Sequence, residues 1–163
     1  MLLINLNINH NSFVTAFMIL YAVIFLMSFF GMEFVAWFTH KYIMHGFLWS
    51  LHKSHHETRT QLLEKNDWFS IIFAVPSWLF IMLGIIYSSP ISVLIGAGMT
   101  AYGAAYFIVH DVIIHQRVKL FRNLDSNYVK TLRRAHKMHH KHLGKEDGES
   151  FGFLIVNKKY LNY

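Results

Sequence analysis

The chain contains no cysteine and few charged residues. The lack of cysteine excludes disulfides, thiolate zinc sites, Cys-ligated iron–sulfur clusters and a cysteine nucleophile, so any metal must be held by nitrogen and oxygen ligands. Charged residues make up 15% of the sequence, against roughly 25% in soluble domains. Hydrophobic residues make up 54%. The length of 163 residues is that of a single domain, residues 1–163, and its composition indicates a membrane protein.

Basic residues are absent from residues 1–39 and 67–114. All fifteen Lys and Arg lie in two windows, Lys41 to Lys65 and Arg117 to Lys159. A nucleic-acid-binding protein would not separate its basic windows with long uncharged apolar runs, so we expect no nucleic-acid partner. The positive-inside rule accounts for the pattern and places both windows on the cytoplasmic side. The N-terminus lacks a basic region and a small-residue cleavage site, so we expect no cleaved signal peptide.

Three apolar stretches are long enough to cross a bilayer, which takes about 20 residues. They cover residues 13–38, in which Glu33 is the only charge, 68–87 and 91–109. The sequence therefore predicts an all-α integral membrane protein with three transmembrane helices, and a fourth remains possible. Ser89 and Pro90 fit a helix cap and a first helical residue between the last two spans. Small residues spaced by four, such as Gly96 and Thr100, favour close helix packing.

Ten of the twelve histidines form two matched sets, each an H-x4-H motif followed by H-x2-H-H. The first set is His40, His45, His52, His55 and His56, and the second is His110, His115, His136, His139 and His140. They lie in His-rich segments, residues 40–66 and 110–163, which follow the first and third spans and so share one membrane face. Residues i, i+3 and i+4 of a helix share a side, so each H-x2-H-H motif should converge. An α-helix separates i and i+5 by about 140°, so the H-x4-H pairs need a π-bulge, a helix end or two metals between them.

Ten imidazoles are too many for one metal ion, since a structural zinc takes four ligands. Two metals with open coordination positions would use eight to ten, which predicts a di-metal centre in a cytoplasmic cap. Imidazole suits zinc, copper, iron and nickel; iron is the natural choice for oxygen chemistry, and zinc and manganese remain open. A histidine-rich metal transporter is an alternative, but transporters place their ligands near the bilayer midplane. Here the histidines begin where the spans end.

Three segments carry a family resemblance: "GMEFVAWFTHKYIMHGFLWSLHKSHH", "IGAGMTAYGAAYFIVHDVIIHQR" and "AHKMHHKHLGKEDGESFGFL". They resemble the bacterial β-carotene 3-hydroxylases of the fatty-acid hydroxylase and sterol desaturase superfamily. The resemblance covers about residues 31 to 155 and all ten paired histidines. The histidine motifs are shared across the superfamily, whereas the flanking "KYIMHG", "GAGMTAYG" and "SFGFL" single out the carotenoid branch. The tail after Leu154 carries no motif.

The resemblance implies hydroxylation of β-ionone rings, converting β-carotene through β-cryptoxanthin to zeaxanthin in the bacterial inner membrane. It implies that the ten histidines bind two iron ions (Fe2+), that O2 is the co-substrate, and that reduced ferredoxin and its reductase supply electrons. The expected partners are thus the lipid bilayer, β-carotene and related carotenoids, and ferredoxin, while the oligomeric state is not predicted. A fatty-acid or sterol hydroxylase, or one acting on ketocarotenoids, is the alternative within the superfamily.

Three carboxylates lie near the histidine motifs. Asp111 follows His110 and could orient a ligand imidazole through its other N–H, or form an ion pair with Arg117. Glu33 lies seven residues before His40, and an acid this close to lipid is a functional candidate. It could orient a ligand histidine or relay protons. The alternative is that it is an interfacial charge that reaches outwards. Asp67 could cap the helix that begins at Trp68.

Overall fold

The computed structural model describes residues 2–57, 61 and 63–161, with side chains from residue 10 onwards. Within this part all regular structure is helical. Three helices are long and apolar enough to cross a membrane, His10–Phe47, Lys65–Ile86 and Pro90–Ile114. The predicted all-α architecture with three membrane-spanning helices is confirmed, and the described residues contain no fourth candidate.

Two of the three long helices change their geometry at the same end of the molecule. Helix α1 (Leu2–Phe38) continues into a π-helical segment, η1 (Thr39–Phe47), and α4 (Pro90–Tyr106) continues into η3 (Phe107–Ile114). The sequence ended these spans at residues 38 and 109, so both helices run further than predicted. The first is interrupted at Gly46, whose backbone angles (φ −106°, ψ −121°) are not helical. The remaining elements are α2 (Trp49–His56), the short η2 (Lys65–Asp67), α3 (Trp68–Ile86), α5 (Asn127–Lys141) and η4 (Lys158–Tyr160).

Helices α3 and α4 form the predicted hairpin. The Ser89 hydroxyl accepts a hydrogen bond from the backbone N–H of Ser92 at 3.4 Å, and Pro90 is the first residue of α4. This is the usual place for proline, whose missing N–H would have no helical partner there. The Ser92 hydroxyl in turn donates to the carbonyl of Phe80, at 2.8 Å.

Helix α4 lies between α1 and α3 and packs against both. A Cβ added at Gly96 would lie 2.7 Å from the carbonyl oxygen of Ser77 on α3, and one added at Gly98 would lie 2.7 Å from that of Phe25 on α1. Such distances leave no room for a side chain. The close packing predicted at Gly96 is therefore confirmed, and Gly98 provides the same close approach on the other side.

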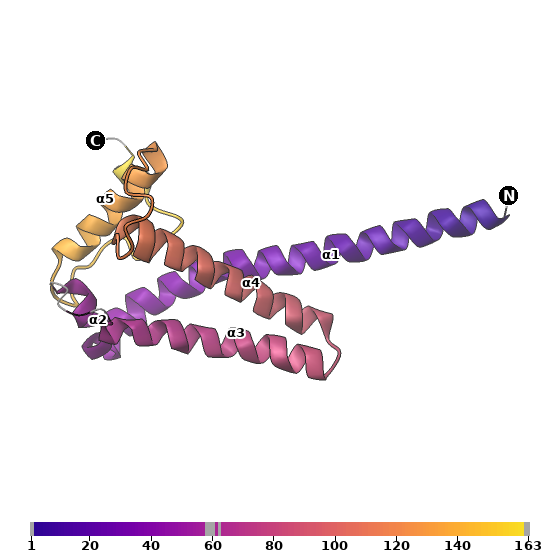
Figure 1. Ribbon diagram of the computed structural model, residues 1–163, viewed down its shortest axis with the longest axis horizontal. Helices are drawn as coiled ribbons and strands as arrows, with labels where there is room; N and C mark the ends of the chain where they lie inside the picture. The colour runs from indigo at the N-terminus through magenta and orange to yellow at the C-terminus, as the bar shows by residue number, and fades with distance from the viewer. Residues whose placement is uncertain (1, 58–60, 62, 162–163) are drawn as a thin grey trace.

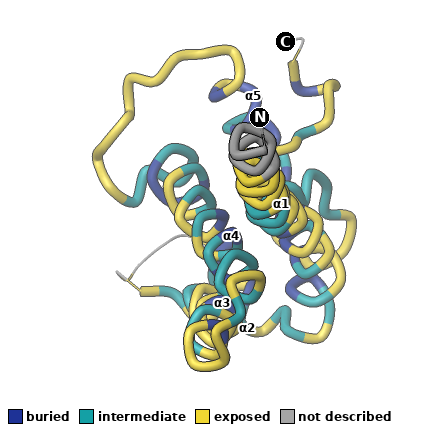
Figure 2. Tube along the Cα trace, turned by 90° about the vertical axis from the view of Figure 1, so that its right-hand side faces the viewer, coloured by how far each residue is buried: buried dark blue, intermediate teal, exposed yellow. Residues whose placement is uncertain are grey.

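The histidine-bearing segments lie at one end of the bundle, and the N-terminal part of α1 extends far beyond the hairpin at the other end (Figure 1). The outer faces of the long helices carry exposed apolar side chains, such as Met27 (71% exposed) and Ile85 (67%), as expected of surfaces that face lipid. The buried core lies near the histidine end and contains Met32, Ala36, Tyr102 and Phe153. Residues 118–126, which join η3 to α5, are exposed throughout (Figure 2).

The predicted capping role of Asp67 at the start of α3 is wrong. Asp67 itself has helical backbone angles (φ −65°, ψ −17°) and its side chain makes no cap hydrogen bond to α3, whereas a capping residue is normally extended. Its carboxylate instead accepts from the backbone N–H of Glu64 at 2.9 Å and from Arg117 at 2.7 and 2.8 Å. Asp67 thus closes the η2 turn and ties it to the end of η3.

Candidate metal centre

The π-helical segments explain the H-x4-H spacing. A π-helix forms hydrogen bonds between residues five apart, and the backbone N–H of His115 donates to the carbonyl of His110 at 2.9 Å. In η1 the N–H of Leu48 donates to the carbonyl of Ile43 at 3.0 Å. Of the arrangements that the sequence left open for the H-x4-H pairs, the structure has the π-helical one in both places. His40 and His45 lie on η1, and His110 and His115 lie on η3 and at its end.

The histidines gather into two groups whose ligand nitrogens lie within 4.8 Å of one another. The first group contains His40, His45, His52 and His139, and the second contains His55, His115, His136 and His140. His56 adjoins the first group, since its Nε2 lies 3.2 Å from that of His52. His110 adjoins the second, with its Nε2 3.1 Å from that of His55. All ten paired histidines are therefore close together, in two sets of five.

Each group takes histidines from both halves of the sequence. On α2, His52 and His56 join the first group while His55 joins the second. On α5, His136 and His140 join the second group while His139 joins the first. The expectation that each H-x2-H-H motif converges on one point is thus correct for the i, i+4 pairs and wrong for the third histidine of each motif. The reason is that α2 and α5 lie against each other through their histidines, as the ring centroids of His56 and His140, 4.6 Å apart, illustrate.

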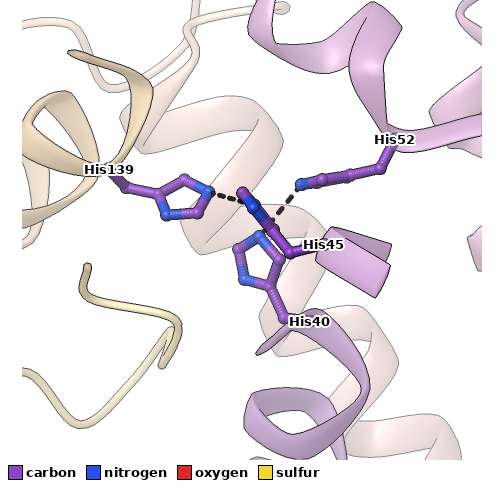
Figure 3. Close-up of side chains that lie close together, drawn as sticks. All are labelled: His40, His45, His52 and His139. Carbon is purple, nitrogen blue, oxygen red and sulfur yellow. Dashed lines mark hydrogen bonds between the residues drawn. The ribbon is translucent and has the colours of Figure 1, made fainter. Parts of the chain in front are cut away.

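Hydrogen bonds at Nδ1 fix the tautomer of several rings. Four Nδ1 atoms lie 2.9 to 3.1 Å from backbone carbonyl oxygens, which can only accept: His40 with Phe151, His45 with Lys145, His56 with His142, and His139 with Glu149. Each of these Nδ1 atoms must carry the ring proton. In the neutral imidazole the lone pair then lies on Nε2, which is the atom that faces the other histidines (Figure 3).

The separations between Nε2 atoms indicate that a cation belongs between them. Nε2 of His45 and Nε2 of His139 are 3.3 Å apart, yet both bear lone pairs and cannot form a hydrogen bond with each other. An ion bound at about 2.1 Å by two nitrogens separates them by about 3.0 Å at a right angle and about 3.4 Å at the tetrahedral angle. The pairs His40–His52, at 3.1 Å, and His55–His110, at 3.1 Å, fall in the same range. The donor set therefore fits a bound metal ion in each group.

Four of the paired histidines outside the membrane-spanning helices are kept neutral by burial. Burial, helped by neighbouring imidazoles, lowers the pKa of His139 and of His140 to about 2. Burial likewise lowers the pKa of His52 to about 3 and that of His56 to about 4. A metal ligand must be unprotonated, so these rings are in the ligating form throughout the neutral range. The Nε2 atom of His140 is buried and has no hydrogen-bond partner among the described residues, which leaves it available to a metal.

Asp111 contacts both candidate partners named from the sequence. Its Oδ1 accepts from Arg117 at 2.8 Å, and its Oδ2 lies 3.6 Å from Nδ1 of His110. Arg117 also binds Asp67, so one guanidinium holds the end of η3 to the η2 turn. This network extends to the histidines, because Asn66 of the same turn lies 2.7 Å from Nδ1 of His52.

Glu33 is buried (6% exposed) and anchors the C-terminal segment. Its Oε1 accepts hydrogen bonds from three consecutive backbone N–H groups, those of Phe153, Leu154 and Ile155, at 2.9 to 3.0 Å. Its Oε2 accepts from the Tyr102 hydroxyl at 2.7 Å. Glu33 thus does not reach outwards. It fixes residues 145–155, hereafter the strap, whose Lys145, Glu149 and Phe151 carbonyls orient three histidines of the first group.

Sequence reasoning missed the strap and the η2 turn. Backbone carbonyls carry no signal in a sequence, and neither Asn66 nor Glu64, whose Oε2 lies 3.4 Å from Nδ1 of His55, belongs to a motif. The glycine of "SFGFL" was a usable clue. A Cβ at Gly152 would lie 2.6 Å from the carbonyl oxygen of Ile155, so the turn that presents three N–H groups to Glu33 needs glycine at this position.

A cavity of about 320 Å³ lies between α1, α3 and α4 and reaches the second group. Its lining is mainly apolar and includes Met32, Phe73, Met99, Tyr106 and Phe153, and its polar end is formed by Asp67, His110 and Asp111. Apolar pockets of 300–1,000 Å³ with a few polar groups at one end are typical of small-molecule sites. Of the ten paired histidines, His110 is the one that lines this cavity.

Comparison with known proteins identifies the family. The fatty acid hydroxylase family matches residues 11–157. This chain belongs to the fatty acid hydroxylase family. Among curated relatives of this hydroxylase, a "Beta-carotene hydroxylase" of Pantoea ananas is 48% identical over 135 residues, which cover 83% of this chain and 77% of the relative. A relative with the same name from Pseudescherichia vulneris is 41% identical, covering 86% and 80%. One from Paracoccus sp. is 39% identical, covering 87% and 85%.

The resemblance inferred from the motifs is thus confirmed, both for the superfamily and for its bacterial carotenoid branch. No solved structure matches this hydroxylase family member. It is a hydroxylase-family protein with membrane-spanning helices and two groups of histidines that can each hold a metal ion.

Proposed function

We propose that this protein is a β-carotene 3-hydroxylase that converts β-carotene to β-cryptoxanthin and then to zeaxanthin. The observation that carries the proposal is the apolar cavity that ends at His110 of the second histidine group, in a chain whose relatives are named beta-carotene hydroxylases. A cavity open to the bilayer side of a metal centre suits a substrate that dissolves in lipid. A soluble substrate would have to cross the apolar part of the bundle to reach it.

The reaction balances as R–H + O2 + 2 electrons + 2 protons giving R–OH + H2O. We propose that the two histidine groups hold two iron ions (Fe2+), which when bound supply the reductive activation of O2, and that reduced ferredoxin delivers the electrons. The all-nitrogen donor set is compatible with iron, and the oxygen chemistry expected of a hydroxylase favours iron over zinc. The basic residues of α5, Arg133, Arg134, Lys137 and Lys141, would suit an acidic electron donor.

The protein's own residues have three tasks in this proposal. The strap and the η2 turn hold the histidine rings in the Nδ1–H tautomer, with Nε2 turned inwards. Asp111 lies beside His110 and, with Arg117, fixes the polar end of the cavity. The apolar lining keeps water from the carbon that reacts. Glu33 acts at a distance by holding the strap.

We further propose that the histidine groups face the cytoplasm from a bacterial inner membrane. Both basic windows flank the histidine-bearing elements, as the positive-inside rule requires of a cytoplasmic face. With three spans, the N-terminus would lie on the opposite side.

The test is pigment analysis, by chromatography and mass spectrometry, of a β-carotene-accumulating bacterium that expresses the chain. We expect products with one and two added oxygen atoms that co-elute with β-cryptoxanthin and zeaxanthin. His139→Ala should abolish turnover because it removes a ligand from the first group. His142→Ala should retain it, because the contact that His142 makes to His56 is through its backbone carbonyl. Unchanged β-carotene with protein present in the membrane would refute the proposal and favour a fatty-acid or sterol substrate.

A further inference from the structure

The cavity beside His110 has a buried floor and an exposed mouth. Phe69, Tyr102 and Phe153 of the floor are 3 to 4% exposed. The exposed residues of its lining are four small ones, Ser70 and Ala74 on α3 and Thr100 and Gly103 on α4, and one large one, Phe107, at the start of η3. The four small residues form the mouth. These four belong to two membrane-spanning helices, so the mouth opens sideways, towards lipid. The four residues lie in the halves of α3 and α4 away from their hairpin, and in these halves the two helices move apart (Figure 1).

Gly103 differs from the other glycines of α4. At Gly96 and Gly98 an added Cβ would meet a neighbouring helix at 2.7 Å, so packing explains both residues. At Gly103 an added Cβ would meet nothing within 4 Å. Glycine inside a helix costs about 0.5–1 kcal/mol relative to alanine, and no helix contact accounts for it here. What glycine does at this position is leave the mouth of the cavity open.

The size of the cavity sets how much of a carotenoid it can hold. A volume of about 320 Å³ corresponds to a space about 7 Å on a side. A carotenoid is an apolar rod about as long as the hydrocarbon core, roughly 30 Å. One end ring fits into the cavity and most of the polyene must remain outside it. The mouth between α3 and α4 faces the apolar part of the bilayer, which can accommodate the polyene.

We propose that the carotenoid enters sideways from the bilayer, with one β-ionone ring against His110 and the polyene passing out between Ser70 and Ala74 on one side and Thr100 and Gly103 on the other. This slot rests on the proposed function for the identity of its ligand. Gly103 is then a specificity-determining residue, since it lets a stiff chain lie across α4 without interrupting the helix. The site holds one ring at a time, so the second ring requires the substrate to leave and return reversed.

The decisive variant is Gly103→Leu, because the new side chain has room to extend and would fill the mouth without displacing a neighbouring helix. Its matched control is Gly31→Leu on α1. Gly31 is also exposed within a membrane-spanning helix, an added Cβ there likewise meets nothing within 4 Å, and it does not line the cavity. Ala74→Leu narrows the same slot from α3.

Two readouts are compared across these proteins: hydroxylation of β-carotene in cells, and the carotenoid that metal-depleted protein retains when purified from β-carotene-accumulating cells. We expect Gly103→Leu and Ala74→Leu to lose at least tenfold in hydroxylation and fivefold in retained carotenoid, with unchanged metal content after reloading. Gly31→Leu should match the wild type in both.

If Gly103→Leu and Ala74→Leu both retain as much carotenoid as the wild type, the slot is overturned, whatever their hydroxylation activity. Equal losses in Gly31→Leu would overturn it too, since that result would assign the effect to the helix surface in general. A wild-type protein that retains carotenoid without hydroxylating it would refute the proposed reaction alone, and the retention comparison would still decide on the slot.

Discussion

Replacing Glu33 should empty one metal site and spare the other. The Glu33 carboxylate accepts four hydrogen bonds, three of them from consecutive backbone N–H groups of the strap. Each buried donor left without a partner costs about 1–3 kcal/mol, so Glu33→Ala would cost at most about 4–12 kcal/mol if nothing moved. Because detachment lets the three freed N–H groups bind water and so avoids this cost, we expect the strap to detach.

The detachment should affect the two histidine groups unequally. The strap carbonyls of Lys145, Glu149 and Phe151 orient His45, His139 and His40, all of the first group. Loss of such an orienting contact typically weakens metal binding 10–100-fold, and here three are lost together. In the second group, Nδ1 of His55 lies 3.4 Å from Glu64 and Nδ1 of His110 lies 3.6 Å from Asp111, and neither carboxylate belongs to the strap.

The assay is metal content per chain after equilibration against a metal buffer in detergent. Wild-type protein should hold two ions, Glu33→Ala close to one, and Glu33→Gln an intermediate number because it keeps an acceptor oxygen for the strap. Glu57→Ala, which removes an exposed carboxylate paired with Lys53, is the control and should hold two. Two ions in Glu33→Ala would refute the reasoning, and so would a content close to zero, which would show that both groups depend on the strap.

Three further predictions follow from other contacts. Asn66→Ala removes the acceptor 2.7 Å from Nδ1 of His52 and should weaken metal binding by the first group about 10–100-fold in a chelator competition; an unchanged affinity would contradict the assigned contact. Arg117→Leu leaves two partly buried carboxylates without their shared cation and should lower the unfolding temperature in detergent, whereas exposed Arg122→Leu should not; equal temperatures would refute the bridge. Labelled β-carotene chased with unlabelled β-cryptoxanthin should give diluted label in zeaxanthin, because each ring needs a separate binding event; undiluted label would contradict one-ring binding.

Much of the site could be predicted because its chemistry is unusual in a membrane sequence. Ten histidines at the ends of uncharged apolar runs have few explanations, and the H-x4-H spacing was already inconsistent with a plain α-helix. The assignment of each histidine to one of the two groups could not be predicted. Whether His55 belongs to the first or the second group depends on how α2 packs against α5, and no local sequence pattern encodes that packing. The strap escaped prediction because it acts through backbone carbonyls. Asp67 was assigned to the wrong partner because its carboxylate binds the guanidinium of Arg117, fifty residues away in the sequence, and not the backbone N–H groups at the start of α3.

His55 of α2 belongs to the second group and His139 of α5 belongs to the first, so each of these helices contributes to both groups. This has a consequence for how the protein matures in the cell. Helix α5 supplies His139 to one group and His136 and His140 to the other, and it begins only at Asn127. A nascent chain that has already placed all three spans in the bilayer therefore still lacks part of each group. Neither histidine group is complete until α5 has been synthesised and has folded back against α2, so the two groups are completed in one step and not one after the other.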